Sequence, residues 1–128
     1  MKPVQLLVLC LALAGAHAPA QAAPPPGSPV QASAEEQAIM NRIERDIRMP
    51  QEAERLAAYH RYYAWQQRAD GLRKVIAIYV GARGRAGERR WVTEAALPVI
   101  DDGGCDVVSL SYDVASQQIE QIGCNGYA

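Results

Sequence analysis

The stretch "RKVIAIYVG" (Arg73–Gly81) carries the strongest strand signal in the chain. Its apolar residues fill both faces of a strand, with Val75, Ala77 and Tyr79 on one side and Ile76, Ile78 and Val80 on the other. A strand that is apolar on both faces is buried on both faces. We therefore expect it to be central in a sheet, with other parts of the chain packed on each side.

The segments that flank this strand predict further strands and turns. "RADG" (68–71) is typical of a turn that enters the central strand. Before it, "QEAERLAAYHRYYAWQQ" (51–67) combines a helix-favouring first half with an aromatic second half. We expect a loop or helical turn through about Ala57, then a strand from Tyr59 to Trp65 whose side chains alternate between the core and a second face.

After the central strand, a glycine-rich loop "GARGRAGE" (81–88) leads to a predicted strand "RRWVTEAA" (89–96). Pro98 interrupts this strand, because proline lacks the amide hydrogen that a strand interior needs. "DDGG" (101–104) then turns the chain.

The sequence near Ser33 predicts the start of a helix. Ser33 and Glu36 have the spacing of a capping box, in which each side chain bonds the backbone amide of the other residue. Ile39, Ile43 and Ile47 follow at intervals of four and define one apolar stripe. Pro50 ends the helix, because it disfavours helical geometry at the residue before it. We expect an amphipathic helix whose stripe covers the sheet.

The C-terminal stretch "GGCDVVSLSYDVASQQIEQIGCNG" (103–126) predicts a hairpin. With its turn at Val114-Ala115, Cys105 lies opposite Cys124, and we expect these two residues to form a disulfide. The same register pairs Val107 with Ile122 and Leu110 with Ile119. It sends Ile119 and Ile122 to opposite faces unless a bulge lies between them.

The N-terminal stretch predicts export. Lys2 precedes an apolar run from Val4 to Ala14 and then small residues, the order found in a signal peptide. We assign residues 1–22 to a signal peptide, 23–32 to a proline-rich disordered tether and 33–128 to one small domain. The expected localisation is periplasmic or secreted, without a membrane span, and an oxidising compartment favours the disulfide.

The predicted fold class is α+β: an N-terminal amphipathic helix packed on an antiparallel, four- to five-stranded sheet, mostly a meander, with a disulfide closing the C-terminal hairpin. In outline this architecture resembles that of other small exported α+β proteins of bacteria. Some of those proteins inhibit lysozymes or assist envelope assembly. The likeness concerns no specific residue.

Charge and composition exclude several functions. Removal of residues 1–22 leaves 12 basic and 14 acidic residues, without the basic excess of a nucleic-acid binder. The predicted mature chain has a single histidine, His60, so it lacks a zinc ligand set, and we expect no cofactor and no metal. The sequence contains no Gly-x-Ser-x-Gly elbow, no P-loop and no dinucleotide-binding fingerprint.

The candidate binding surface combines the arginine-rich loop with the aromatic strand, and consists of Arg83, Arg85, Arg89, Arg90, Tyr59, His60 and Tyr62. Guanidinium groups bind anions, and exposed aromatic residues mark interfaces. The expected function is a non-enzymatic binding or inhibitory module, with an envelope protein or anionic envelope polymer as partner. Two alternatives are a small periplasmic hydrolase or lyase that uses His60 with a carboxylate, and a structural accessory protein.

Overall fold

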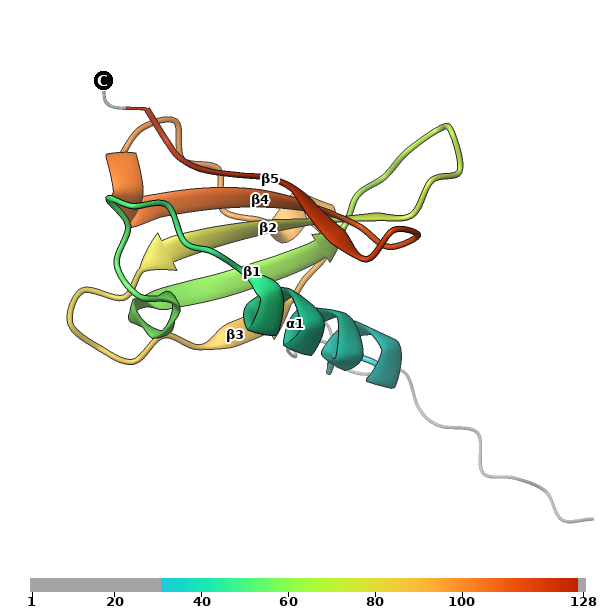
Figure 1. The fold of residues 1–128 in the computed structure, drawn as a ribbon, viewed down its shortest axis with the longest axis horizontal. Coiled ribbons are helices and arrows are strands. Elements are labelled where there is room, and N and C mark those ends of the chain that lie inside the picture. Colours follow the sequence, from blue (N-terminus) through green and yellow to red (C-terminus); the bar gives the residue numbers. More distant parts are fainter. Residues whose placement is uncertain (1–30, 127–128) are drawn as a thin grey trace, which may run out of the picture.

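The computed structural model describes residues 31–126. The predicted signal peptide and residues 23–30 of the predicted tether lie outside the described residues. One helix, α1 (Ala34–Asp46), packs on a five-stranded sheet (Figure 1). The strands are β1 (Tyr59–Trp65), β2 (Lys74–Gly81), β3 (Arg89–Trp91), β4 (Val107–Asp113) and β5 (Gln118–Cys124). None of the helices within residues 31–126 has the length and apolar character needed to span a bilayer.

The strand order is β3-β1-β2-β4-β5, and every neighbouring pair is antiparallel except β1 with β3. The predicted fold class is thus confirmed. β3 departs from a simple meander because the chain leaves β2, passes around the start of β1 and continues beside β1 in the same direction. It ends at Trp91, so most of the strand predicted over residues 89–96 is wrong, and a short 3-10 helix, η2 (Glu94–Ala96), follows instead.

Helix α1 begins with the predicted capping box. The Ser33 hydroxyl accepts a hydrogen bond from the Glu36 amide at 3.2 Å, and the Glu36 carboxylate accepts one from the Ser33 amide at 2.8 Å. Ile39 and Ile43 are buried against the sheet, and Ile47 is the residue at which the helix ends. The predicted apolar stripe therefore covers one face of the sheet.

Strand β2 is central, as its sequence predicts. Val75, Ala77 and Tyr79 are fully buried on the face that α1 covers. Ile76, Ile78 and Val80 are only half-buried on the other face. The connection from β3 to β4 crosses the sheet, since these strands lie on opposite sides of β1 and β2, and Figure 1 draws it behind the strands.

The C-terminal hairpin forms in a register different from the predicted one. Residues 114–117 form the turn, and Asp113 pairs with Gln118, whereas Leu110 pairs with Ile122. A bulge beside Ser111 and Tyr112 adds one residue to β5. The predicted pairing was wrong because the turn has four residues rather than two and because of this bulge. As a result Ile119 and Ile122 both pack against the core.

The predicted disulfide between Cys105 and Cys124 is present. Cys105 lies in the 3-10 helix η3 (Gly104–Asp106), directly before β4, and the Cα atoms of the two cysteines are 4.6 Å apart. Val108, rather than Cys105, is the ladder partner of Cys124. The bridge therefore ties the entrance of β4 to the end of β5.

Candidate anion-binding site

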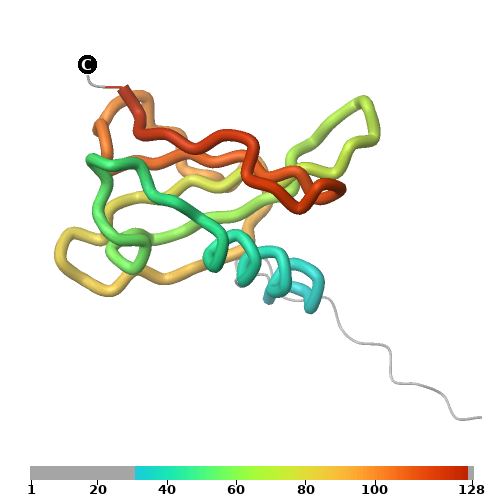
Figure 2. The backbone as a smooth tube through the Cα atoms, in the orientation of Figure 1, coloured from blue at the N-terminus to red at the C-terminus, as the bar shows by residue number. Residues whose placement is uncertain are grey.

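The arginine-rich loop between β2 and β3 is held at both ends. The Ala82 amide donates to the Ala58 carbonyl at 2.8 Å, and the Gly87 amide donates to the Ala57 carbonyl at 2.9 Å. Gly87 lies so close to β1 that a Cβ atom there would overlap the Tyr59 carbonyl. Figure 2 shows this loop beside the turn that precedes β1. The loop thus has a defined position at the end of the sheet.

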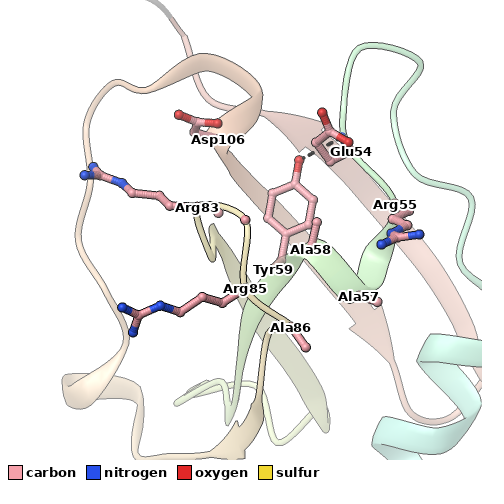
Figure 3. A pocket seen from close by; sticks show the side chains of 11 residues that line it. Glu54, Arg55, Ala57, Ala58, Tyr59, Arg83, Arg85, Ala86 and Asp106 are labelled. Carbon is pink, nitrogen blue, oxygen red and sulfur yellow. Dashed lines mark hydrogen bonds between the residues drawn. The ribbon is translucent and has the colours of Figure 1, made fainter.

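The tip of the loop is a tight turn that exposes two arginines. Arg83 and Gly84 have φ angles of 51° and 83°, and the Arg85 amide donates to the Ala82 carbonyl at 3.2 Å. Positive φ at both central positions is the mark of a type I′ turn. In Figure 3 the side chains of Arg83 and Arg85 extend from the tip toward the same side. Both residues are exposed.

A surface depression of about 690 Å³ lies between this loop and residues 54–59 (Figure 3). Arg83 and Arg85 line one wall, Arg55 lies on the opposite wall, and Tyr59 is between them. The Tyr59 ring is almost completely buried, and its hydroxyl donates to the Cys105 carbonyl at 2.6 Å and accepts from the Glu54 amide at 3.0 Å. The depression therefore has a rigid aromatic floor.

The guanidinium groups around this depression make no ion pair within the described part of the chain. Of the 12 lysines and arginines in residues 31–126, seven form ion pairs with carboxylates. The five that do not are Arg42, Arg48, Arg55, Arg83 and Arg85. Three of these five line the depression. Arginines that make no ion pair with residues 31–126 are therefore concentrated at this site.

Two exposed carboxylates, Glu54 and Asp106, also line the depression. Burial raises the pKa of the Tyr59 hydroxyl, and the negative charges of Asp106 and Glu54 raise it further, although the bond from the Glu54 amide opposes this. The phenol is therefore protonated at neutral pH and remains a donor to Cys105.

The structure does not place the predicted surface residues together. Arg89 lies on the α1 side of the sheet, where it donates to Asn41 at 2.7 Å and to Gln37 at 3.1 Å, and it pairs with Glu44 at 3.4 Å. These contacts tie β3 to the helix. Arg89 therefore stabilises the fold, whereas Arg83 and Arg85 form no ion pair with any residue of 31–126.

His60, Tyr62 and Arg90 lie on the face of the sheet opposite α1. The Nδ1 atom of His60 accepts a hydrogen bond from the Glu88 amide at 3.2 Å, and Arg90 pairs with the Glu88 carboxylate at 2.6 Å. The hydrogen bond from Arg90 lowers the pKa of Glu88. The carboxylate of Glu88, the residue whose amide bonds His60, is thus already paired, and none of His60, Tyr62 and Arg90 lines the arginine depression.

Sequence reasoning missed Glu54, Arg55 and Asp106. Glu54 and Arg55 precede Arg83 by 29 and 28 residues, and Asp106 follows it by 23. Only the close packing of the loop on β1 brings these residues to one site. The conspicuous signal for this packing is Gly87, whose lack of a side chain permits the contact. Among residues 31–126 no group of three or more His, Cys, Asp or Glu side chains is placed to hold a metal ion.

Comparison with protein-family models, curated proteins and solved structures finds no match to this chain.

Proposed function

We propose that this chain is a small exported, non-enzymatic binding module of the cell envelope, and that it binds an anionic group of its partner between Arg83, Arg85 and Arg55. The observation that carries the proposal is that three arginines without ion-pair partners among the described residues line one depression. Guanidinium groups form forked hydrogen bonds with carboxylates and phosphates, which makes such a cluster suited to either.

The position of the arginines supports binding rather than a purely structural role. Arg83 and Arg85 are exposed, yet they project from a turn whose two ends are fixed by backbone hydrogen bonds. A fixed loop reduces the conformational entropy that a ligand must remove when it binds. Arg61 and Arg89 differ from them, because both form ion pairs with Glu44 of α1 and so attach the helix to the sheet.

The proposed export and the role in the envelope rest on the signal-peptide pattern of residues 1–22 and on the preference of disulfides for oxidising compartments. An anionic envelope polymer, or an acidic surface of an envelope protein, is the class of partner that the arginines would recognise. An inhibitory role would follow if that partner were an enzyme whose active site is acidic.

Titration of the mature protein with ethyl phosphate at low ionic strength tests the proposed site. Backbone amide resonances of residues 82–88 should shift on titration and identify the loop as the contact. The double variant Arg83→Glu/Arg85→Glu should abolish these shifts and the retention of the protein on cross-linked envelope fractions. Raising the salt concentration should weaken binding, because exposed charges are screened.

The matched control is Arg42→Glu/Arg48→Glu, which changes the net charge equally but removes the other two arginines without ion pairs in the described chain. This control should bind ethyl phosphate as the parent protein does. Equal loss of binding in both double variants would assign the effect to net charge and would overturn the site. Binding that survives Arg83→Glu/Arg85→Glu would overturn it as well.

A further inference from the structure

Opposite charges share the arginine depression without neutralising one another. Arg55, Arg83 and Arg85 line it together with Glu54 and Asp106, yet none of these five residues takes part in an ion pair within residues 31–126. Arginine and carboxylate side chains that can reach one another on a surface commonly pair, as Arg90 does with Glu88 at 2.6 Å. Unpaired arginines and unpaired carboxylates of the described residues therefore line the same depression from separate positions.

The acidic side of this space continues into a second, smaller depression. Its volume is about 260 Å³, and it shares Glu54, Tyr59 and Asp106 with the first depression and adds Glu52. No arginine lines it. Figure 3 shows Asp106 and Glu54 at one end of the site and Arg85 at the other. Carboxylates therefore line both depressions, whereas the arginines line only the first.

The carboxylates have defined positions of their own. Asp106 belongs to η3, which the disulfide at Cys105 attaches to β5, and its side-chain oxygen lies 3.5 Å from the place a Cβ atom at Gly81 would occupy. The backbone of Glu54 is fixed by its bond to the Tyr59 hydroxyl. The backbone positions of both carboxylates are therefore set by the fold.

We infer that the ligand of this site is dipolar: it carries an oxyanion that binds Arg83 and Arg85 and an ammonium group that binds Glu54 and Asp106. This inference rests on the proposed function and specifies its ligand. A purely anionic ligand is attracted by the arginines but repelled by the carboxylates, whereas a dipolar ligand gains from both. Phosphoethanolamine head groups and the free ends of peptides both have this chemistry.

Two matched pairs of probes test the inference and distinguish the two sources. Phosphoethanolamine is compared with ethyl phosphate, which lacks the amine. Glycylglycine is compared with N-acetylglycylglycine, whose amine is blocked. In at least one pair, the dipolar probe should bind at least about threefold more tightly than its matched anion. This factor corresponds to the free energy of one exposed ion pair. The pair that shows this preference identifies a head group or a peptide end as the source.

The double variant Glu54→Gln/Asp106→Asn gives the decisive result, because its effect should change sign with the probe. It should weaken binding of the preferred dipolar probe by about threefold and strengthen binding of the matched anion, which is no longer repelled. Glu54→Gln keeps the backbone bond to Tyr59, and a denaturation curve confirms that the variant folds.

Failure of the inference is separable from failure of the proposed site. If anions bind in a way that depends on Arg83 and Arg85, but neither dipolar probe is preferred, the anion site stands and the dipolar inference is overturned. If the variant strengthens binding of dipolar and anionic probes alike, the inference is also overturned. If neither anions nor dipolar probes bind at any accessible concentration, both proposals are overturned.

Discussion

The hydroxyl of Tyr59 donates a hydrogen bond to the carbonyl of Cys105 at 2.6 Å, across 46 residues of sequence. The same oxygen accepts a hydrogen bond from the Glu54 amide at 3.0 Å. One side chain thus connects the start of β1, the turn that carries the disulfide and a wall of the candidate site. Stability and the shape of the site are linked through this atom.

Tyr59→Phe should therefore destabilise the protein by about 1–3 kcal/mol, because it leaves the Cys105 carbonyl and the Glu54 amide without their partner. Urea denaturation measures this loss. Tyr62→Phe is the matched control, because Tyr62 is half-buried on the opposite face of the sheet. The urea midpoint of this variant should stay near that of the parent protein. Equal midpoints for the two variants would show that the Tyr59 hydroxyl contributes nothing.

Removal of the disulfide should lower the free energy of unfolding by about 3 kcal/mol according to the loop-entropy relation, because the bridge joins residues 19 apart in sequence. Cys105→Ser/Cys124→Ser is the appropriate variant, because changing both residues leaves no free thiol. Thermal unfolding measures the loss, and thiol titration of the denatured, unreduced chain from residue 23 onward should find no free thiol in the parent. Two free thiols in the parent would contradict the bridge.

The elements that could be predicted from the sequence are those decided by local chemistry. The capping box at Ser33 and the isoleucine stripe depend on residues within a few turns, and the structure confirms them. The two apolar faces of β2 identify the central strand for the same reason. The pairing of Cys105 with Cys124 was predicted correctly from a wrong register, because residues 23–128 contain no other cysteine with which either could pair.

Features that depend on the path of the chain could not be predicted. The parallel placement of β3 follows from how the 82–88 loop wraps around β1, which no local pattern encodes. The candidate site has the same origin. Arg83 and Arg85 were recognisable as a basic loop, but Glu54 and Asp106 have no sequence signal that relates them to it, and they reach the site only through packing.

Arg89 and Arg90 are neighbours on β3, but their substitutions by alanine should have different effects on the stability of the fold. Arg89→Ala removes bonds to Asn41 and Gln37 that join β3 to α1, and we expect a loss of about 1–2 kcal/mol in unfolding free energy. Arg90→Ala removes one exposed ion pair with Glu88, and its unfolding midpoint should not change measurably. Chemical denaturation of both variants compares them directly. Equal stabilities would contradict the structural role assigned to Arg89.

Alkaline pH should destabilise the fold through its buried tyrosines. Burial raises the pKa of Tyr59, Tyr63, Tyr79 and Tyr112 above 10.0, the ordinary value for tyrosine. Above pH 10 the unfolded chain loses these protons while the folded chain keeps them, so their contribution to stability is complete below pH 10 and falls as the pH rises.

Absorbance titration of tyrosinate checks this prediction. In the folded protein most of the signal should appear only when the protein unfolds, at a pH above that of the denatured chain, and circular dichroism should change in the same interval. Ionisation of all tyrosines near pH 10 in a protein that is still folded would contradict the burial of their hydroxyls.

Gly87→Ala should disturb the stability and the candidate site together. A Cβ atom at this position would overlap the backbone of Tyr59 and lie 2.7 Å from the His60 nitrogen. Both obstacles are backbone atoms of β1, so the loop must move, and we expect a loss of about 3 kcal/mol. Movement of the loop also displaces Arg83 and Arg85 from Arg55, so affinity for ethyl phosphate should fall by more than the small loss of folded protein explains.

Gly123→Ala is the matched control for this substitution. A Cβ atom at Gly123 would meet nothing within 4 Å, and its φ lies outside the left-handed region. Its unfolding midpoint and its affinity for ethyl phosphate should therefore equal those of the parent protein. If Gly87→Ala were as stable as Gly123→Ala, the loop would not be packed on β1. If Gly87→Ala were destabilised but bound ethyl phosphate normally, the position of the loop would not control the site.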